Sequence, residues 1–378
     1  MLEKIKNRII AKRFDREIKK ELEEIEKLGA GQQDPYVYKG TNVLKNKLGI
    51  KDGLILEQAE TELTVHNLLN VDEKIRCEKG KFDFEHLKKI HKHIFGDLYK
   101  WAGKPRTIDI YKSEVVLNDL SVEYSNHEMI EKDMKAAIDN LNSVKWDKLN
   151  NEEIVKEFAP RIAEVWKVHA FREGNTRTTM TFACQYAEAH GFKLDKTVFR
   201  ENSGYVRNSL VMASIGEYAE PKYLEGKIRE AIGRGQAEQI KDRCMMQLLD
   251  REKEVLGFIK YKIQEVPTVE NVEKLIGYAQ SKVQEFNGAN AQKYEKDLKL
   301  FEKGKEILEG VDRRVIKEVF VKETGVNLDH STTEKIRRLN QKDSMFHTYS
   351  SLKNYPFGRN ERAQEIVKEI SKGKGLIR

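Results

Sequence analysis

The stretch from Val165 to Thr181, VWKVHAFREGNTRTTMT, decides how the whole sequence is interpreted. Its first part continues an apolar helical pattern that ends at His169, and its last part begins a second helix after Gly174. One histidine, one acid, a Gly-Asn pair and one arginine lie between the two within nine residues. The stretch is therefore either a turn between helices or a site that holds an anion beside a base.

The chemistry of these residues suits a nucleotide. A helix start presents free N–H groups and a partial positive charge, and Gly174 lets the backbone approach a phosphate closely. Arg177 adds a guanidinium that matches phosphate geometry. Glu173 would repel phosphate but could hold a Mg²⁺ that bridges to it, and His169 could take a proton from a hydroxyl. Each residue alone also has an ordinary structural role, so the local sequence leaves both interpretations open.

Composition narrows the class of protein. The 378 residues give room for two or three domains. No apolar run reaches the length of a membrane span, and the charged first residues predict no Sec-type signal peptide. Cys77, Cys184 and Cys244 have neither metal-pair spacing nor the even count of a disulfide framework. We expect synthesis in a reducing compartment.

Helical periodicity dominates the chain and predicts an all-α fold. Apolar residues recur at helical spacing over the segments 53–70, 82–106, 122–143 and 151–169. The exception is RTIDIYKSEVVL, residues 106–117, where alternation and β-branched residues predict a strand or hairpin. Past residue 220 the sequence reads as a series of charged amphipathic helices.

These patterns predict four parts: an N-terminal charged helix at 1–29, a core domain at 30–220, a linker at 221–240, and a helical C-terminal domain of unknown role at 241–378. The formal charge of +7 lies entirely past residue 220, and the last part of the chain carries a marked basic excess. That excess predicts contact with nucleic acid or anionic lipid, or a recognition tail. A solvated tail is the alternative.

The stretch HAFREGNTR, from His169 to Arg177, resembles the Fic motif, whose tighter form is H-P-F-x-(D/E)-G-N-G-R. Two flanking segments, DPYVYKGTNVLKNKLGI at 34–50 and FEHLKKIHKHIFGDLYKWAGKPRTIDIYKSE at 84–114, resemble the entry segment and the helix with flap of bacterial Fic proteins. The resemblance covers about residues 30–220 in the expected order. It implies the Fic fold, a helical core with a β-hairpin flap, here followed by a C-terminal helical region.

The resemblance also implies residue roles. His169 corresponds to the general base and Glu173 to the Mg²⁺ ligand. The nucleotide-binding positions are Gly174, Asn175, Thr176 and Arg177, of which Arg177 corresponds to the arginine that contacts the more distal phosphates. The target-binding flap corresponds to Thr107, Ile108, Asp109, Ile110, Tyr111 and Lys112, which in this family pairs with the target backbone as an added strand.

The implied activity is that of a protein adenylyltransferase, which transfers AMP from ATP to a Ser, Thr or Tyr hydroxyl of a target protein. ATP is then the substrate and Mg²⁺ the cofactor. The implied partners are a target on the flap and a small antitoxin-like inhibitor in trans. The basic C-terminus would meet nucleic acid or a secretion machinery. The implied location is the bacterial cytoplasm, or a host or recipient cell reached by type IV secretion.

Three positions depart from the common motif and keep alternatives open. Ala170 replaces a frequent Pro, Thr176 replaces the second Gly, and Met180 stands where many members carry a second arginine. One alternative is a non-catalytic nucleotide-binding scaffold or effector with a degenerate motif. The other is a Doc-like phosphotransferase, which Thr176 argues against, because those proteins tend to have Lys there. The single formal match to the family's inhibitory pattern, TVFREN at 197–202, is interpreted as chance.

Overall fold

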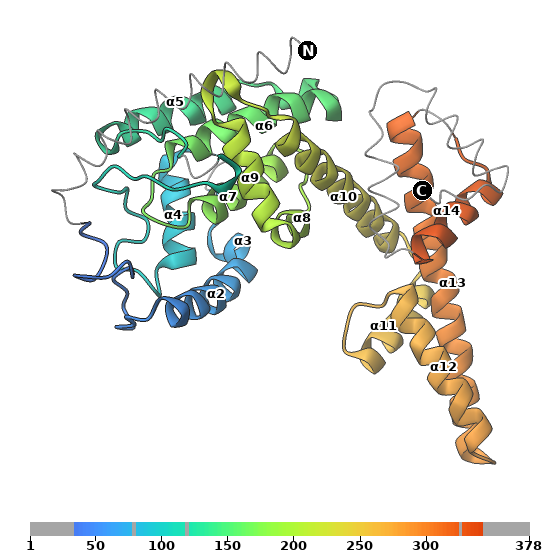
Figure 1. Ribbon diagram of the computed structural model, residues 1–378. Helices are drawn as coiled ribbons and strands as arrows, with labels where there is room; N and C mark the ends of the chain where they lie inside the picture. The colour runs from blue at the N-terminus through green and yellow to red at the C-terminus, as the bar shows by residue number, and fades with distance from the viewer. Residues whose placement is uncertain (1–33, 78–80, 118–120, 325–326, 343–378) are drawn as a thin grey trace, which may run out of the picture.

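The computed structural model describes residues 34–77, 81–117, 121–324 and 327–342, and its regular structure is helical (Figure 1). The first body consists of α2 (Gly53–Leu69), α3 (Val71–Lys74), α4 (Phe84–Phe95), α5 (Ile130–Asn142), α6 (Asn151–Val168), α7 (Asn175–Ala189), α8 (Lys196–Glu201) and α9 (Ser203–Ala213). It is followed by α10 (Lys222–Met246), α11 (Asp250–Ile263), α12 (Val269–Glu285), α13 (Ala289–Thr324) and α14 (His330–Lys342). Short 3-10 helices lie at Val115–Leu117, His127–Met129, Trp146–Lys148 and Gly216–Tyr218. The predicted all-α class is confirmed.

Helices α6 and α7 lie at the centre of the first body. A capping box starts α6: the Asn150 side chain accepts from the N–H of Glu153, whose carboxylate accepts from the N–H of Asn150 at 2.8 Å. Burying each large apolar side chain of these helices contributes about 1.5–3 kcal/mol. The fully buried ones are Phe158, Ile162, Trp166, Phe182 and Tyr186. Because α5 packs on α6 and α4 on α7, the end of α6 and the start of α7 are held in place.

The β-hairpin predicted at 106–117 is not confirmed. Among the described residues the structure has no strand, only isolated bridges such as Val37 opposite Leu44. Side-chain bonds hold this segment instead of a ladder. The buried Arg106 donates to the carbonyls of Ile108 (2.6 Å) and Ser125, and Asp109 accepts from the His127 N–H at 2.7 Å. The alternation of polar and apolar residues in TIDI, 107–110, therefore reflects side chains that point in turn toward solvent and toward the first body.

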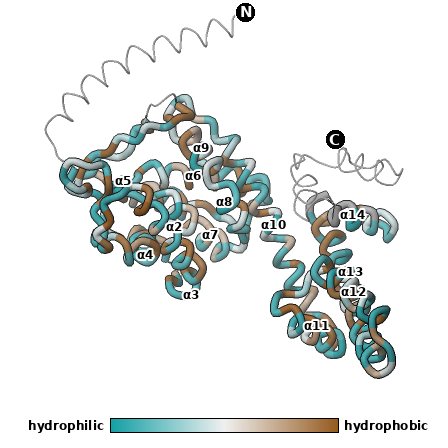
Figure 2. Tube along the Cα trace, turned by 60° about the horizontal axis from the view of Figure 1, so that its bottom comes forward, coloured by the Kyte–Doolittle hydropathy of each residue, from teal (hydrophilic) through white to brown (hydrophobic). Residues whose placement is uncertain are grey.

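The segment predicted as a linker at 221–240 belongs to one continuous helix, α10, which leads from the first body to the second (Figures 1 and 2). Leu224 and Ile228 are buried in the first apolar core, whereas Ile240 and Cys244 belong to the second. Helical periodicity thus continues through residues 221–240, where the basic part of the sequence begins and a linker was expected. The domain boundary itself stays a prediction, and the helix predicted at 1–29 lies outside the described residues.

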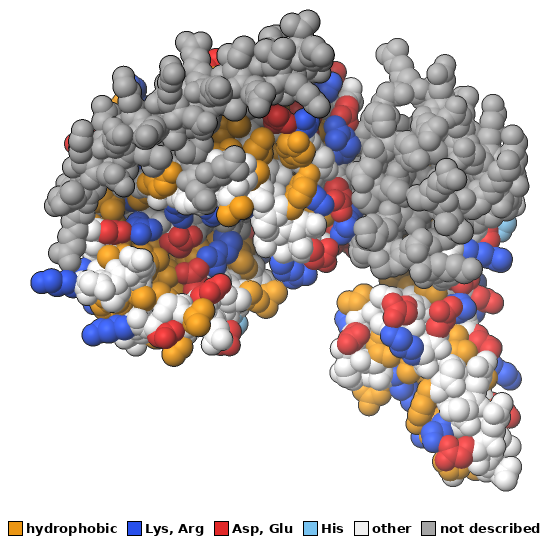
Figure 3. Space-filling model, viewed as in Figure 1, with side chains coloured by type: hydrophobic (Ala, Val, Ile, Leu, Met, Phe, Trp, Pro, Cys, Tyr) orange, Lys and Arg blue, Asp and Glu red, His pale blue; other side chains and the backbone are white. Residues whose placement is uncertain are grey.

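The second body is helical, as predicted for the C-terminal region. Helices α12 and α13 run side by side as an antiparallel pair joined near Gly288, whose φ is 64° (Figure 1). On the face drawn in Figure 3, basic and acidic side chains are intermixed over α11 to α13. Most of the basic tail, residues 343–378, lies outside the described residues. Among the described helices, none combines the length and apolar character needed to cross a membrane.

Candidate active site

The loop between α6 and α7 is fixed by an unusual backbone turn. His169 ends α6 with φ 50° and ψ 53°, a left-handed conformation that non-glycine residues seldom adopt. The Asn175 side chain then closes the loop by bonding both to the N–H of Phe171 (2.9 Å) and to its carbonyl (2.7 Å). Asn175 was predicted to bind the nucleotide. Its side chain instead holds the loop, and only its backbone N–H, at the helix start, remains suited to an anion.

Gly174 occupies the N-cap position of α7 for two physical reasons. Its φ of 81° is favourable for glycine but strained for other residues. A Cβ added there would lie 2.3 Å from two ring atoms of Phe95, which is completely buried. The glycine therefore lets the start of α7 lie directly on the Phe95 ring.

His169 is buried, and its imidazole is packed between aromatic rings. The Tyr124 ring stacks on it with centroids 4.0 Å apart, and the Trp166 ring meets it edge-on at 5.0 Å. Neither ring nitrogen has a hydrogen-bond partner among the described residues. Burial, and then the positive charges of Lys112, Arg207 and Arg106, hold the pKa of His169 well below its usual value. The imidazole is therefore neutral at physiological pH and can accept a proton.

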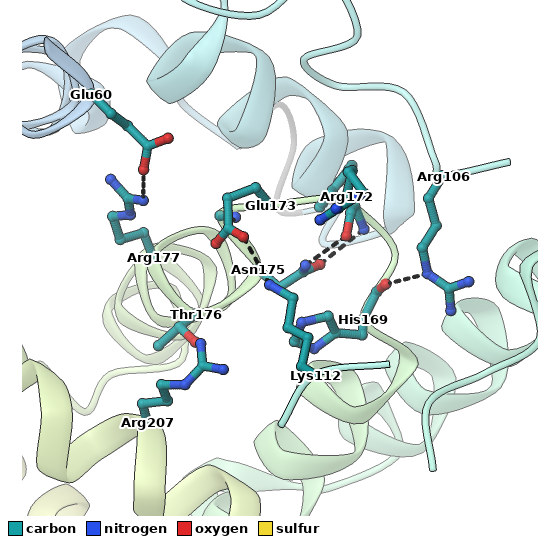
Figure 4. Close-up of polar contacts among 12 residues, drawn as sticks. Glu60, Arg106, Lys112, His169, Arg172, Glu173, Asn175, Thr176, Arg177 and Arg207 are labelled. Carbon is teal, nitrogen blue, oxygen red and sulfur yellow. Dashed lines mark hydrogen bonds and ion pairs between the residues drawn. The ribbon is translucent and has the colours of Figure 1, made fainter. Parts of the chain in front are cut away.

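Glu173 lies beside His169 and carries a stable negative charge. Its Oε2 accepts from the Lys112 ammonium at 2.9 Å, and its Oε1 accepts from the Gly174 N–H at 3.0 Å (Figure 4). Burial alone would raise the pKa of Glu173, but Lys112 and the Gly174 N–H outweigh it, so that the pKa is about 2. Lys112 comes from the predicted flap, so the flap segment reaches the predicted metal ligand.

Arg177 and Thr176 complete the first turn of α7. Arg177 donates to the Thr64 hydroxyl at 2.9 Å, pairs with Glu60, and lies over the Phe95 ring at 4.7 Å. The Thr176 hydroxyl accepts from the Trp166 indole N–H at 3.0 Å. Both predicted phosphate-binding side chains thus already have protein partners. Met180, which replaces the second arginine, is buried in the core.

The predicted flap residues lie beside this loop. The side chains of Thr107, Asp109 and Tyr111 are exposed and those of Ile108, Ile110 and Lys112 are half-buried. Lys112 contacts the loop residues through its ion pair with Glu173. The structure therefore brings together His169, Glu173, the start of α7 and Lys112 (Figure 4).

Known proteins share this region. The model of the Fic/DOC family matches residues 81–187. A probable protein adenylyltransferase, y4lH of Sinorhizobium fredii, is 32% identical over 171 residues, which make up 44% of this chain and 81% of that protein. The chain belongs to the Fic/DOC family. The quoted stretch is therefore its Fic motif.

Two further comparisons concern Bartonella proteins. The protein adenylyltransferase VbhT of Bartonella schoenbuchensis is 34% identical over 165 residues, which make up 44% of this chain and only 33% of that longer protein. A crystal structure of the VirB-translocated effector BepC of Bartonella tribocorum with bound AMPPNP is 23% identical, with a TM-score of 0.44 over 52% of this chain and 96% of that one. The family assignment rests on the sequence relatives.

Several residues around the Fic motif cannot be recognised from the sequence. Glu60 holds Arg177, and Glu114, Tyr124 and Arg207 lie around His169. None is at a spacing from the motif that marks it, because tertiary packing alone brings these positions together. The one usable signal was Glu114, an acid that stands directly before the apolar run VVL at 115–117.

Proposed function

We propose that the chain is a protein adenylyltransferase that uses ATP and His169 as the general base. The observation that carries the proposal is a buried, neutral imidazole with both nitrogens free of partners among the described residues, next to an ionised Glu173 and a helix start. The sequence relatives that are named protein adenylyltransferases support the same activity.

The reaction would proceed by direct attack on the α-phosphorus. His169 takes the proton from a Ser, Thr or Tyr hydroxyl of the target, and the hydroxyl oxygen forms a bond to the α-phosphorus. The bond from that phosphorus to the oxygen of the β-phosphate breaks, and pyrophosphate leaves. The N–H groups at the start of α7 and the Arg177 guanidinium stabilise negative charge on the phosphates.

The residues present fit a divalent cation at Glu173. The carboxylate is ionised and already faces a cationic group, the Lys112 ammonium. Within the described ranges, no three His, Cys, Asp or Glu side chains gather to hold a metal ion. That suits Mg²⁺, which usually takes one or two carboxylates together with phosphates and water. A bound Mg²⁺ would neutralise charge on the phosphate oxygens.

Lys112 is expected to compete with the cation. Breaking a charge-assisted contact of this kind changes affinity by about tenfold, so Lys112→Met should bind Mn²⁺ about tenfold more tightly in the absence of nucleotide. Free Mn²⁺ measured by electron paramagnetic resonance checks this. Lys148→Met, which removes an exposed lysine paired only with its neighbour Asp147, is the matched control. Equal Mn²⁺ affinity in all three proteins would contradict a cation site at Glu173.

The target is proposed to dock along residues 107–113. The alternation of exposed and half-buried side chains there supports an extended segment that could pair with a target backbone. An inhibitor in trans, export by type IV secretion and contact of the basic tail with nucleic acid stay predictions. The role of residues 241–378 is equally open to experiment.

One observation favours a second candidate function, a nucleotide-binding scaffold. Met180 is buried where many family members carry an arginine, and Arg177 is engaged by Glu60. Incubation of the purified chain with α-labelled ATP, GTP, UTP and CTP in a bacterial lysate separates the two. The proposal expects label from ATP on a protein band. Nucleotide binding without label on any band would favour the scaffold.

A further inference from the structure

Catalytic histidines are commonly oriented by a hydrogen bond to the ring nitrogen that does not react. His169 has no such bond among the described residues. Its ring orientation must therefore come from packing and from the left-handed backbone. The contact that covers its face is Tyr124, whose ring lies 4.0 Å away at an interplanar angle of 29°. Trp166 bounds the ring at its edge.

Tyr124 is itself anchored at its hydroxyl. The phenol O–H donates to Oε1 of Glu114 at 3.2 Å, and Glu114 is only 3% exposed. Arg207, on α9, binds that carboxylate at two points, through Nη2 to Oε1 at 2.6 Å and Nε to Oε2 at 3.2 Å. Figure 4 shows Arg207 reaching from α9 toward the loop that bears His169. A chain of contacts thus runs from α9 through Glu114 and Tyr124 to the imidazole.

The contacts among Arg207, Glu114 and Tyr124 go beyond what is needed to stabilise a buried carboxylate. A buried carboxylate is stable only when it is paired and hydrogen-bonded, and Arg207 alone would satisfy most of that need. Glu114 in addition accepts from the one phenol that covers the His169 ring. Glu114 also follows directly on the proposed flap, so the same carboxylate links the target-docking segment to the base.

We propose that Tyr124 is the positioning residue of His169 and that Glu114 and Arg207 hold Tyr124 in place by its hydroxyl. This inference rests on the proposed function only where it predicts the rate of adenylyl transfer. The placement of the imidazole is a property of the folded chain and can be measured without any target. Tyr124 touches the base and is not expected to touch the reacting atoms.

Several charges face the imidazole, and they fix the sign of the expected changes. Lys112 comes from the flap segment, Arg207 from α9 and Arg106 from the start of that segment, and all three lower the pKa of His169. Glu114 accepts from the Tyr124 hydroxyl, and Glu173 accepts from the Lys112 ammonium. Removing the Tyr124 ring admits water, and desolvation is the main cause of the depressed pKa, so the pKa of His169 should rise.

The test compares Tyr124→Leu with Tyr124→Phe in the full chain by histidine-labelled NMR. His169 is assigned with His169→Ala. In Tyr124→Leu we expect the His169 signals to titrate at a pH about one unit or more above that of the wild type. In Tyr124→Phe, which keeps the stacked ring, the shift should be less than half as large.

The rate readout uses label incorporated from α-labelled ATP into lysate protein. Tyr124→Leu should lower the apparent kcat about 10- to 100-fold with the apparent KM for ATP nearly unchanged, because the base is misplaced while the phosphate site is intact. Tyr124→Phe should recover most of that loss. Arg207→Gln should lower the rate less than Tyr124→Leu and also raise the pH at which His169 titrates.

Two results would overturn the inference. One is a Tyr124→Leu protein whose His169 signals titrate as in the wild type. The other is a Tyr124→Phe protein and an Arg207→Gln protein that both match the wild type in titration and in rate, since the anchor at the Tyr124 hydroxyl would then have no part. If Tyr124→Leu does not fold, Tyr124→Phe and Arg207→Gln decide by the NMR titration alone. A wild-type chain that transfers no label would reject the proposed function and leave the NMR test of ring placement intact.

Discussion

Replacing His169 with Ala is expected to reduce adenylyl transfer about 10²- to 10⁴-fold, because a general base contributes a factor of that size and no other described side chain shares its position. ATP binding should change little, since the proposed phosphate contacts, the free N–H groups and Arg177, lie in the first turn of α7. Initial rates of label transfer from α-labelled ATP, with ATP affinity measured separately, check both parts.

The matched control for this substitution is His66→Ala, which removes an exposed histidine from α2. It should transfer label at the wild-type rate. The wild-type rate should also stay level between about pH 6.5 and 8, because a histidine whose pKa lies well below 6.5 is already deprotonated there. A His169→Ala protein that retains more than a tenth of the wild-type rate would contradict the assigned role.

Gly174→Ala is expected to lower the free energy of unfolding by about 2–5 kcal/mol and to abolish transfer. Alanine at φ 81° is strained by about 1–2 kcal/mol. Its Cβ would also meet Phe95 ring atoms at 2.3 Å, and overpacking of this kind costs about 1–3 kcal/mol. Because Arg177 lies on the same ring, displacing Phe95 also moves a proposed phosphate contact. Urea unfolding gives the stability difference.

Gly191→Ala separates these two causes. Gly191 has φ 86°, yet a Cβ there would meet nothing within 4 Å. It should therefore show only the backbone strain, about 1–2 kcal/mol, with transfer retained. Equal losses of stability and activity in the two variants would show that the contact with Phe95 has no part in shaping the site.

The sequence predicts the local secondary structure of this chain better than it predicts which distant residues contact each other. The helical pattern before His169 and the glycine after Glu173 are enough to place the α6–α7 turn, because both signals lie within one segment. The α10 helix was interpreted as a linker because charge balance changes there, although periodicity continues. The hairpin expected at 106–117 is replaced by bonds from the Arg106 side chain, which periodicity cannot reveal.

The surroundings of the candidate site were the hardest part to foresee. Glu60, Glu114 and Arg207 lie far along the chain from the motif. Only the packing of α2, of α9 and of the segment before the 3-10 helix Val115–Leu117 brings them beside it. Lys112 was predicted to bind a target as part of the flap, but nothing in the spacing indicated an ion pair with Glu173. Such pairings depend on tertiary geometry, and a single sequence carries no record of them.

The central claim is that the group transferred to protein is AMP. Mass spectrometry of a protein modified by the purified chain, with Mg²⁺ and ATP supplied, measures this most directly. The account predicts an AMP adduct on a Ser, Thr or Tyr side chain with wild type and none with His169→Ala. A phosphate adduct alone, or no adduct on any protein despite demonstrated ATP binding, would contradict it.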